Sequence, residues 1–264
     1  MDARTEKLTP LVSILMVTYN RAGYIRHAIN SVLAQTYTSW ELIVVDDGSV
    51  DETAAIMATY DDARIRFIRH RENKGVHAAR TRALEEAQGE CVAILDSDDL
   101  WNSEEKLHAQ VAFLEGHPDH ALVGTFINTI DASGNRMAQN AYHTDDLSIR
   151  ASILLRNQFA HSSVLMRTRM VHQAGGYRKV LLGEDLDLFL RLGLQGKFSN
   201  IPAYMTSYRI HDGGLSRNGA MMARAVLGFV WKYRAHYPNF FKAYVKSFLA
   251  LMIGRLLDTR TIRR

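Results

Sequence analysis

The stretch LVSILMVTY at residues 11–19 is a run of apolar, partly β-branched residues that ends in polar side chains. ELIVVDD at 41–47 and CVAIL at 91–95 repeat this pattern, and each run ends in or leads into acidic residues. Runs of this length are typical of strands buried on both faces of a parallel sheet. Helical spacing at 24–35 and a good helix-forming composition at 77–87 separate the three runs. The alternation predicts βαβ units.

The expected fold class is therefore α/β, a Rossmann-like and mostly parallel sheet flanked by helices, with a helical tail at the C-terminus. A chain of 264 residues is long enough to bury the core of one such domain. The single cysteine, Cys91, excludes an internal disulfide and a multi-cysteine zinc site. We expect it to be a small core residue, and its isolation fits a reducing, cytoplasmic compartment.

Charge is unevenly distributed along the chain. The segment 219–264 has nine lysines and arginines against one acid, Asp258, whereas the preceding residues have a small excess of acids. A basic tail favours an anionic membrane or nucleic acid, or it is simply a solvated helical face. Because the rest of the chain is acidic, we expect no nucleic-acid partner.

The tail has helical periodicity from residue 240 onward. Phe241, Val245, Phe248 and Met252 fall on one predicted face, and lysines flank it. Two interpretations stay open: an interfacial helix that meets the cytoplasmic face of a membrane, or a stripe that packs on the domain or on a second subunit in a homodimer. The apolar run FLALMIG is too short to span a bilayer, and the polar residues 1–10 predict a flexible leader rather than a signal peptide.

Polar clusters follow the predicted strands where parallel strands share one edge of the sheet, the edge at which such sheets bind ligands. The acids Asp96, Asp98 and Asp99 follow the strand at 91–95. No glycine-rich dinucleotide motif and no P-loop is present, so phosphate must be held mainly by a metal. Carboxylates at this position suit Mg²⁺ or Mn²⁺ shared with a diphosphate. The alternative is a cluster that caps the following helix.

Five motifs, in order, resemble those of the family 2 inverting glycosyltransferases with the GT-A fold. They are VSILMVTYNR, SVLAQTYTSWELIVVDDGSVDET, NKGVHAARTRAL, GECVAILDSDDLW and GEDLDLFLRL, and the likeness covers about residues 11–215. The resemblance implies a nucleotide-sugar-binding half at 11–100 and an acceptor-binding half of the same domain at 101–217. The basic helical tail is then 218–264. Val17 departs from the proline or small polar residue that the family often has.

The resemblance also implies roles for residues of the first half. The implied nucleotide-binding residues are Thr18, Tyr19, Asn20, Asp47, Arg80 and Asp96. Asp47 would accept a hydrogen bond from the base, Asp46 would shape the turn, and Asp98 would be the metal ligand.

The pair Glu184-Asp185 precedes an apolar helical pattern. An acceptor hydroxyl must lose a proton as it attacks, and a positioned carboxylate can take that proton. The resemblance assigns this base to Asp185, with Glu184 beside it. Without the other motifs the pair would be interpreted as a plain helix cap, and we expect Asp187 to serve as a cap in either case.

In YRIHDGGLS, the resemblance places His211 near the metal or the departing diphosphate and Arg209 where it offsets developing charge. The other histidines, including His161 and His172, are expected to be incidental. Trp101 follows the acids directly, and it either stacks on a sugar ring or packs in the core.

The hypothesis is an inverting, metal-dependent transfer of a sugar from a nucleotide-diphosphate donor, UDP being the expected nucleotide, to a saccharide or lipid-linked acceptor. Polysaccharide or glycolipid biosynthesis is the expected setting. The enzyme would be cytoplasmic or peripheral on the cytoplasmic membrane face. A sugar nucleotidyltransferase and a non-catalytic nucleotide-sugar-binding protein are the alternatives. The single glycine in VTYNRAGY argues against the former, and the candidate base argues against the latter.

Overall fold

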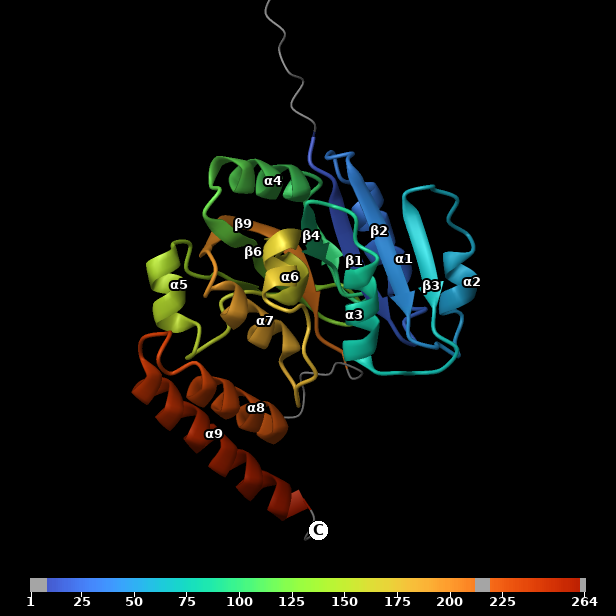
Figure 1. Cartoon of the computed structure of the whole chain (residues 1–264). Helices are drawn as coiled ribbons and strands as arrows, with labels where there is room; N and C mark the ends of the chain where they lie inside the picture. The colour runs from blue at the N-terminus through green and yellow to red at the C-terminus, as the bar shows by residue number, and fades with distance from the viewer. Residues whose placement is uncertain (1–8, 212–218, 262–264) are drawn as a thin grey trace, which may run out of the picture.

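The computed structural model describes residues 9–211 and 219–261, so most of the expected leader lies outside the described residues. The described chain forms one nine-stranded sheet with helices on both faces (Figure 1). The strands are β1 (Val12–Thr18), β2 (Trp40–Asp46), β3 (Ile65–Arg69), β4 (Cys91–Ile94), β5 (Leu100–Trp101), β6 (His120–Ile130), β7 (Arg136–Asn140), β8 (Leu165–Arg167) and β9 (Lys197–Arg209). The α/β fold class is confirmed.

The direction of the strands decides where the site lies. The sheet order is β3-β2-β1-β4-β8-β6-β9-β5, with β7 paired to β6. β3, β2, β1 and β4 are parallel to one another. β8 is antiparallel to both β4 and β6, and β9 is parallel to β6. Therefore β6 and β9 run in the same direction as the first four strands, and only β5, β7 and β8 are reversed. The prediction of a mostly parallel sheet holds.

Two apolar layers cover the sheet. Side chains on one face pack with α1 (Ile25–Leu33), α2 (Thr53–Met57) and α4 (Lys106–Gly116). The other face meets α3 (Val76–Glu85), α5 (Asp146–Ser152), α6 (Thr168–Gln173) and α7 (Glu184–Leu192). Successive residues of β1 and β2 point into opposite layers, as the period of two in a strand requires. Cys91 is buried in the first layer, as expected.

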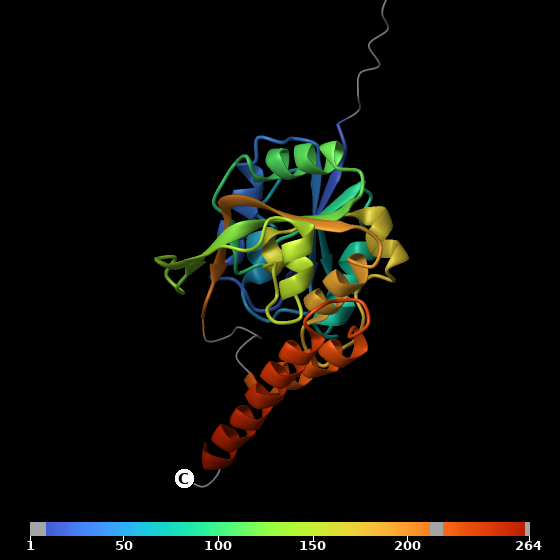
Figure 2. The same ribbon diagram turned by 90° about the vertical axis from the view of Figure 1, so that its left-hand side faces the viewer.

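The tail is a helical hairpin of α8 (Gly219–Lys232) and α9 (Phe240–Thr261) that packs beneath α7 and extends away from the sheet (Figures 1 and 2). Phe229, Tyr233 and Tyr237 belong to the same apolar layer as α7. The Tyr237 hydroxyl donates to the carbonyl of Leu190 at 2.7 Å. The hairpin is thus an extension of the core and does not hang free of it.

A buried carboxylate joins the hairpin to α7. Asp187 is fully buried, and it accepts from Arg191 Nε at 2.9 Å, Lys232 Nζ at 2.9 Å and the Tyr233 hydroxyl at 3.1 Å. Burial by itself raises the pKa of Asp187, but the hydrogen bond from Lys232 and the charge of Arg191 bring it below the ordinary value. The expectation that Asp187 caps α7 is wrong, because its side chain points to the tail and not to the helix N-terminus.

Replacing Asp187 with asparagine is expected to lower the free energy of unfolding by about 3 kcal/mol, because Arg191 keeps a buried charge without its partner. Lys232→Met is the control: its side chain is 46% exposed, so we expect a loss below about 1 kcal/mol. Urea unfolding of both variants measures the difference. Equal losses would contradict the expectation that the buried pair of Asp187 with Arg191 contributes more stability than the half-exposed contact with Lys232.

Candidate active site

A cavity of about 890 Å³ opens at the shared carboxyl edge of the strands. Its wall combines residues that follow β1, β2, β4 and β9 with the segment leading into α7, and Met222 of α8 also lines it. A cavity of this size is in the range of small-molecule binding sites. The lining residues predicted from the sequence are Tyr19, Asn20, Asp47, Arg80, Asp96, Asp98, Glu184, Asp185, Arg209 and His211.

The turn after β1 is held by Asn20. Asn20 adopts a positive φ of 52° and its side-chain oxygen accepts from Val50 N at 2.9 Å, while its own N–H donates to Ser49 Oγ at 2.9 Å. Tyr19 beside it is 41% exposed and faces the cavity. Thr18 is buried and does not line the cavity. Of the three residues, Tyr19 therefore offers the most surface to a ligand.

Asp47 holds the loop that leads into α3. Its carboxylate accepts from Lys74 N at 2.9 Å, from Gly75 N at 2.8 Å, and lies 2.8 Å from His70 Nδ1. A carboxylate offers about four lone-pair positions, so one acceptor position remains for a ligand donor. Asp46, fully buried, accepts from Ser49 N at 2.9 Å and forms an ion pair with Arg69, as its turn-shaping role requires.

A charged network crosses the floor of the cavity. Arg80 donates to Asp96 at 3.1 Å and to Glu184, which joins β4 to the start of α7. His161 Nδ1 lies 3.3 Å from Asp96, and its Nε2 lies 2.9 Å from the Tyr177 hydroxyl. Burial alone raises the pKa of Asp96, but the charges of His161 and Arg80 more than offset this and keep its pKa well below the ordinary range.

The expectation that His161 is incidental is wrong. His161 lies in the short 3-10 helix η1 (His161–Ser163), is 7% exposed, and lines the cavity. Tyr177 and Arg21 are two further residues of the site that sequence reasoning did not single out. Arg21 directly follows the TYN motif, so its position in the sequence was a usable signal, whereas nothing local marks His161 or Tyr177.

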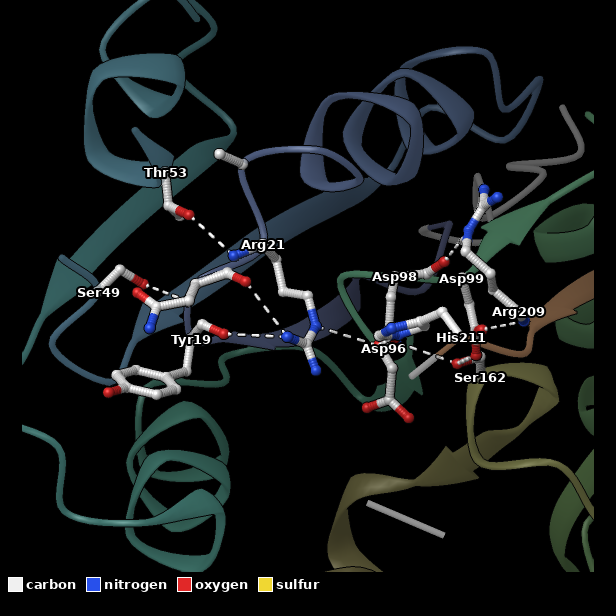
Figure 3. A network of polar contacts seen from close by, with 12 residues as sticks. Tyr19, Arg21, Ser49, Thr53, Asp96, Asp98, Asp99, Ser162, Arg209 and His211 are labelled. Atoms are coloured by element: carbon white, nitrogen blue, oxygen red, sulfur yellow. Dashed lines mark hydrogen bonds and ion pairs between the residues drawn. The ribbon is translucent and has the colours of Figure 1, made fainter. Parts of the chain in front are cut away.

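Asp98 and His211 meet although 113 residues separate them (Figure 3). His211 Nε2 lies 2.9 Å from Asp98 Oδ2, and Arg21 Nε donates to the same oxygen at 3.2 Å. The contact exists because β4 and β9 end at the same edge of the sheet. Tyr24 packs against the His211 ring, with 5.0 Å between ring centroids.

The residues present fit a divalent cation. Asp98 Oδ2 and His211 Nε2 lie 2.9 Å apart, close enough for the carboxylate and the imidazole to contact one ion. Among the described residues no group of three or more such side chains forms a complete protein cage. Mg²⁺ and Mn²⁺ sites that act on phosphates commonly take one or two protein ligands and complete the shell with phosphate oxygens and water.

Asp99, beside Asp98, joins the loop after β4 to the end of β9 and to the helix η1. It is 2% exposed, accepts from Arg209 N at 2.8 Å, and receives the Ser162 hydroxyl at 2.5 Å (Figure 3). Burial, and then the negative charges of Asp98 and Asp96, raise the pKa of Asp99 well above its ordinary value.

The alternative that the acids Asp96, Asp98 and Asp99 cap the following helix is wrong. The N-cap position of α4 is Glu105.

Arg209 is also part of this framework. Its guanidinium donates to the carbonyls of Asp98, Asp131 and Ala132 at 2.8 to 3.1 Å, and it is 7% exposed. Arg209 therefore holds the loop after β4 in place, and its charge lies close to Asp98.

Trp101 is buried, donates from Nε1 to the Ser162 carbonyl at 2.8 Å, and is not among the residues lining the cavity. Stacking of Trp101 on a sugar is excluded in this arrangement.

Asp185 opens into the cavity from the first turn of α7. Gly183, at a φ of 77°, makes the turn that starts the helix, and a β-carbon there would lie 3.3 Å from Phe229 of α8. Asp185 is half-buried and accepts from Asn157 Nδ2 at 3.3 Å. Its neighbour Glu184 is committed to Arg80. Asp185 is thus the carboxylate of this pair that stays available to a ligand in the cavity.

Comparison with known proteins identifies the class. The model of Glycosyl transferase family 2 matches residues 13–181. The chain belongs to this family. It is therefore a glycosyltransferase, and the resemblance seen in its motifs is confirmed. The putative glycosyltransferase EpsE of Bacillus subtilis is 36% identical over 194 residues, which cover 71% of this chain and 68% of EpsE.

Two further proteins extend the comparison. The Escherichia coli UDP-Glc:alpha-D-GlcNAc-diphosphoundecaprenol beta-1,3-glucosyltransferase WfgD is 37% identical over 142 residues, 49% of this chain and 56% of WfgD. The structure of the Pyrobaculum calidifontis mannosyltransferase PcManGT, in complex with GDP-Man and Mn²⁺, superposes with a TM-score of 0.71 at 19% identity, covering 95% of this chain and 74% of PcManGT. The likeness to PcManGT shows the shared GT-A fold.

In the part of the chain that the structure describes, no helix combines the length and the apolar character needed to cross a bilayer.

Asp99→Asn is expected to keep the fold, because an amide can still accept from Arg209 N and donate to Ser162 Oγ. Asp99→Ala is expected to cost about 2 to 3 kcal/mol, since both buried groups lose their partner. In the wild type, protonated Asp99 contributes to the free energy of unfolding below about pH 4. This contribution is lost as the pH rises through the raised pKa that Asp99 has in the folded protein. The amide of the asparagine variant has no such proton to lose.

Urea unfolding at several pH values checks this. The free energy of unfolding of Asp99→Asn should increase relative to wild type as the pH rises above about 4. A difference between the two proteins that does not change with pH would contradict the raised pKa.

Proposed function

We propose that this glycosyltransferase moves a sugar from a uridine diphosphate donor to a hydroxyl of a saccharide acceptor, with inversion at the anomeric carbon. The observation that carries the proposal is that Asp185 and the pair Asp98–His211, from distant parts of the domain's sequence, line one cavity. A group that can take a proton and groups that can hold a diphosphate are thus both within reach of one bound donor.

On the donor side, Tyr19 and Asn20, which line the cavity, would contact the nucleotide. Asp47 has one acceptor position left, which would accept from a base N–H. Asp98 and His211 would hold Mg²⁺ or Mn²⁺, which stabilises the charge on the departing diphosphate when bound. Arg21 adds a positive charge beside Asp98, and Arg80 orients Asp96 toward the ribose or sugar. PcManGT, which shares the fold, is described with Mn²⁺ and a nucleotide sugar.

On the acceptor side, Asp185 is the proposed base. The acceptor oxygen forms a bond to the anomeric carbon while the bond from that carbon to the diphosphate oxygen breaks, and the hydroxyl proton passes to Asp185. A single displacement of this kind inverts the configuration. The side chain of Asn157 and the first turn of α7 fix the direction of the carboxylate. The bond from Arg80 keeps Glu184 from competing for the same proton.

We propose a lipid-linked saccharide as the acceptor class, in polysaccharide or glycolipid biosynthesis. WfgD, with which this chain shares 37% identity over 142 residues, is named for a UDP-glucose donor and a diphosphoundecaprenol-linked acceptor. An acceptor of this class is presented at a membrane surface, so the proposal places the enzyme peripherally on the cytoplasmic face.

Asp185→Asn is expected to lower kcat by on the order of 10² to 10⁴ while leaving the dissociation constant for UDP unchanged, because only the proton acceptor is lost. Asp98→Ala is expected to abolish the dependence of UDP binding on Mn²⁺. Calorimetry measures binding, and release of UDP from a panel of UDP-sugars measures turnover. Asp61→Asn, an exposed acid away from the cavity, is the matched control.

The anomeric configuration of the product, read by NMR, tests inversion directly. Retention of configuration would overturn the single-displacement mechanism. Metal-dependent UDP binding that survives in Asp98→Ala would place the metal elsewhere, and full turnover by Asp185→Asn would remove the proposed base.

A further inference from the structure

The outer face of α9 carries an apolar stripe that the rest of the described chain does not cover. It consists of six residues of 40 to 74% exposure: Phe241, Val245, Phe248, Leu249, Met252 and Ile253. Their spacing places all six on one side of an α-helix, because the positions follow a period near 3.6 residues. The opposite side of the helix is committed to the protein, with Ala243 and Ser247 buried. The stripe is therefore free for a partner outside the chain.

Positive charge accompanies the stripe. Lys242 is exposed on the same side of the helix as the stripe, and Lys246 is exposed at its edge, where its Nζ donates to the carbonyl of Leu155 at 2.7 Å. Arg234 lies 4.6 Å from the ring of the exposed Trp231 at the end of α8. The whole segment 219–264 has nine basic residues and one acid. An apolar face bordered by lysine and arginine is complementary to a surface that is anionic at its rim and apolar below it.

We infer that the outer face of α9 binds the surface of an anionic lipid bilayer, with the helix lying in the plane of the interface. Phe241, Leu249 and Ile253 would enter the acyl region, and Lys242 would face the anionic headgroups. This inference stands on the surface of the tail and does not depend on the proposed donor or acceptor.

A second copy of the chain fits the stripe less well. Two-fold contacts bring the same patch of each subunit together, so the basic residues of both tails would face one another. Interface cores are depleted in charged residues, and here lysines border the stripe directly. An anionic surface neutralises these charges, whereas a second tail doubles them.

Docking through α9 would bring the cavity to the membrane. The hairpin projects from the domain on the side of α7 (Figures 1 and 2), and Met222 of α8 lines the cavity. The contacts of the buried Asp187 carboxylate with Lys232 and Tyr233 join the hairpin to the helix that carries Asp185. A rigid connection of this kind would keep a constant orientation between the bilayer and the site.

The test is co-sedimentation of the full chain with vesicles of phosphatidylcholine alone or mixed equally with phosphatidylglycerol. The triple variant Phe241→Ser, Leu249→Ser, Ile253→Ser is expected to lose at least about 100-fold in partitioning to the anionic vesicles, from the lost burial of three large apolar side chains. Lys242→Gln alone is expected to lose about fivefold. Added salt should weaken wild-type binding.

The matched control carries the same substitution at three exposed apolar residues of the domain, Met137, Leu147 and Leu194. It should sediment as wild type does. Thermal unfolding verifies that the variants fold, and UDP-sugar hydrolysis in the absence of lipid should be equal in wild type and triple variant. Absence of turnover in the wild type would count against the proposed function and leave the lipid inference intact.

Three results would overturn the inference. The first is that the wild type fails to sediment with anionic vesicles. The second is that the triple variant sediments with them as well as the wild type does. The third is that the wild type is a dimer in solution and the triple variant a monomer, while neither protein binds lipid. That result would make the stripe a subunit interface.

Discussion

The site depends on the common direction of six strands. Since β1, β2, β4 and β9 all end at one edge of the sheet, Asn20, Asp47, Asp98 and His211 meet there although they are distant in sequence. β8 lies between β4 and β6 in the sheet and is antiparallel to both, so β6 and β9 run parallel to the first strands. With β9 reversed, His211 would lie at the opposite edge from Asp98.

Within that frame, charge compensation decides which carboxylates are available. Glu184 and Asp96 are committed to Arg80, and Asp99 is buried against Ser162 and Arg209. Buried carboxylates without such partners would be costly. Asp98, which accepts from Arg21 and contacts His211, and Asp185 at the start of α7 both line the cavity. Asp99 belongs to the framework alone, whereas Asp96, Asp98 and Asp185 also line the cavity.

The tail belongs to the same framework. Asp187 places a buried charge one helical turn beyond the first residue of α7, and Lys232 and Tyr233 of the tail satisfy it. The hairpin therefore stabilises the helix that presents Asp185, while its outer face keeps an apolar stripe exposed. One side of the tail serves the active-site framework and the other side meets the surroundings. The two demands explain why α9 has small buried residues, Ala243 and Ser247, on its inner side and exposed apolar residues on its outer face.

Much of the site could be read from the residues alone. Apolar runs that end at polar or acidic residues predicted the strands at 11–19, 41–47 and 91–95, because burial on both faces of a sheet requires such runs. The order of the motifs identified the family. The roles of individual polar residues were less accessible. Trp101 turned inward to a buried carbonyl, His161 paired with Asp96, and Asp187 faced the tail. Each outcome depends on a partner 45 to 65 residues away. Local pattern determines which segments become strands and helices, whereas long-range packing decides which neighbours satisfy a buried polar group, and only the tertiary structure contains that information.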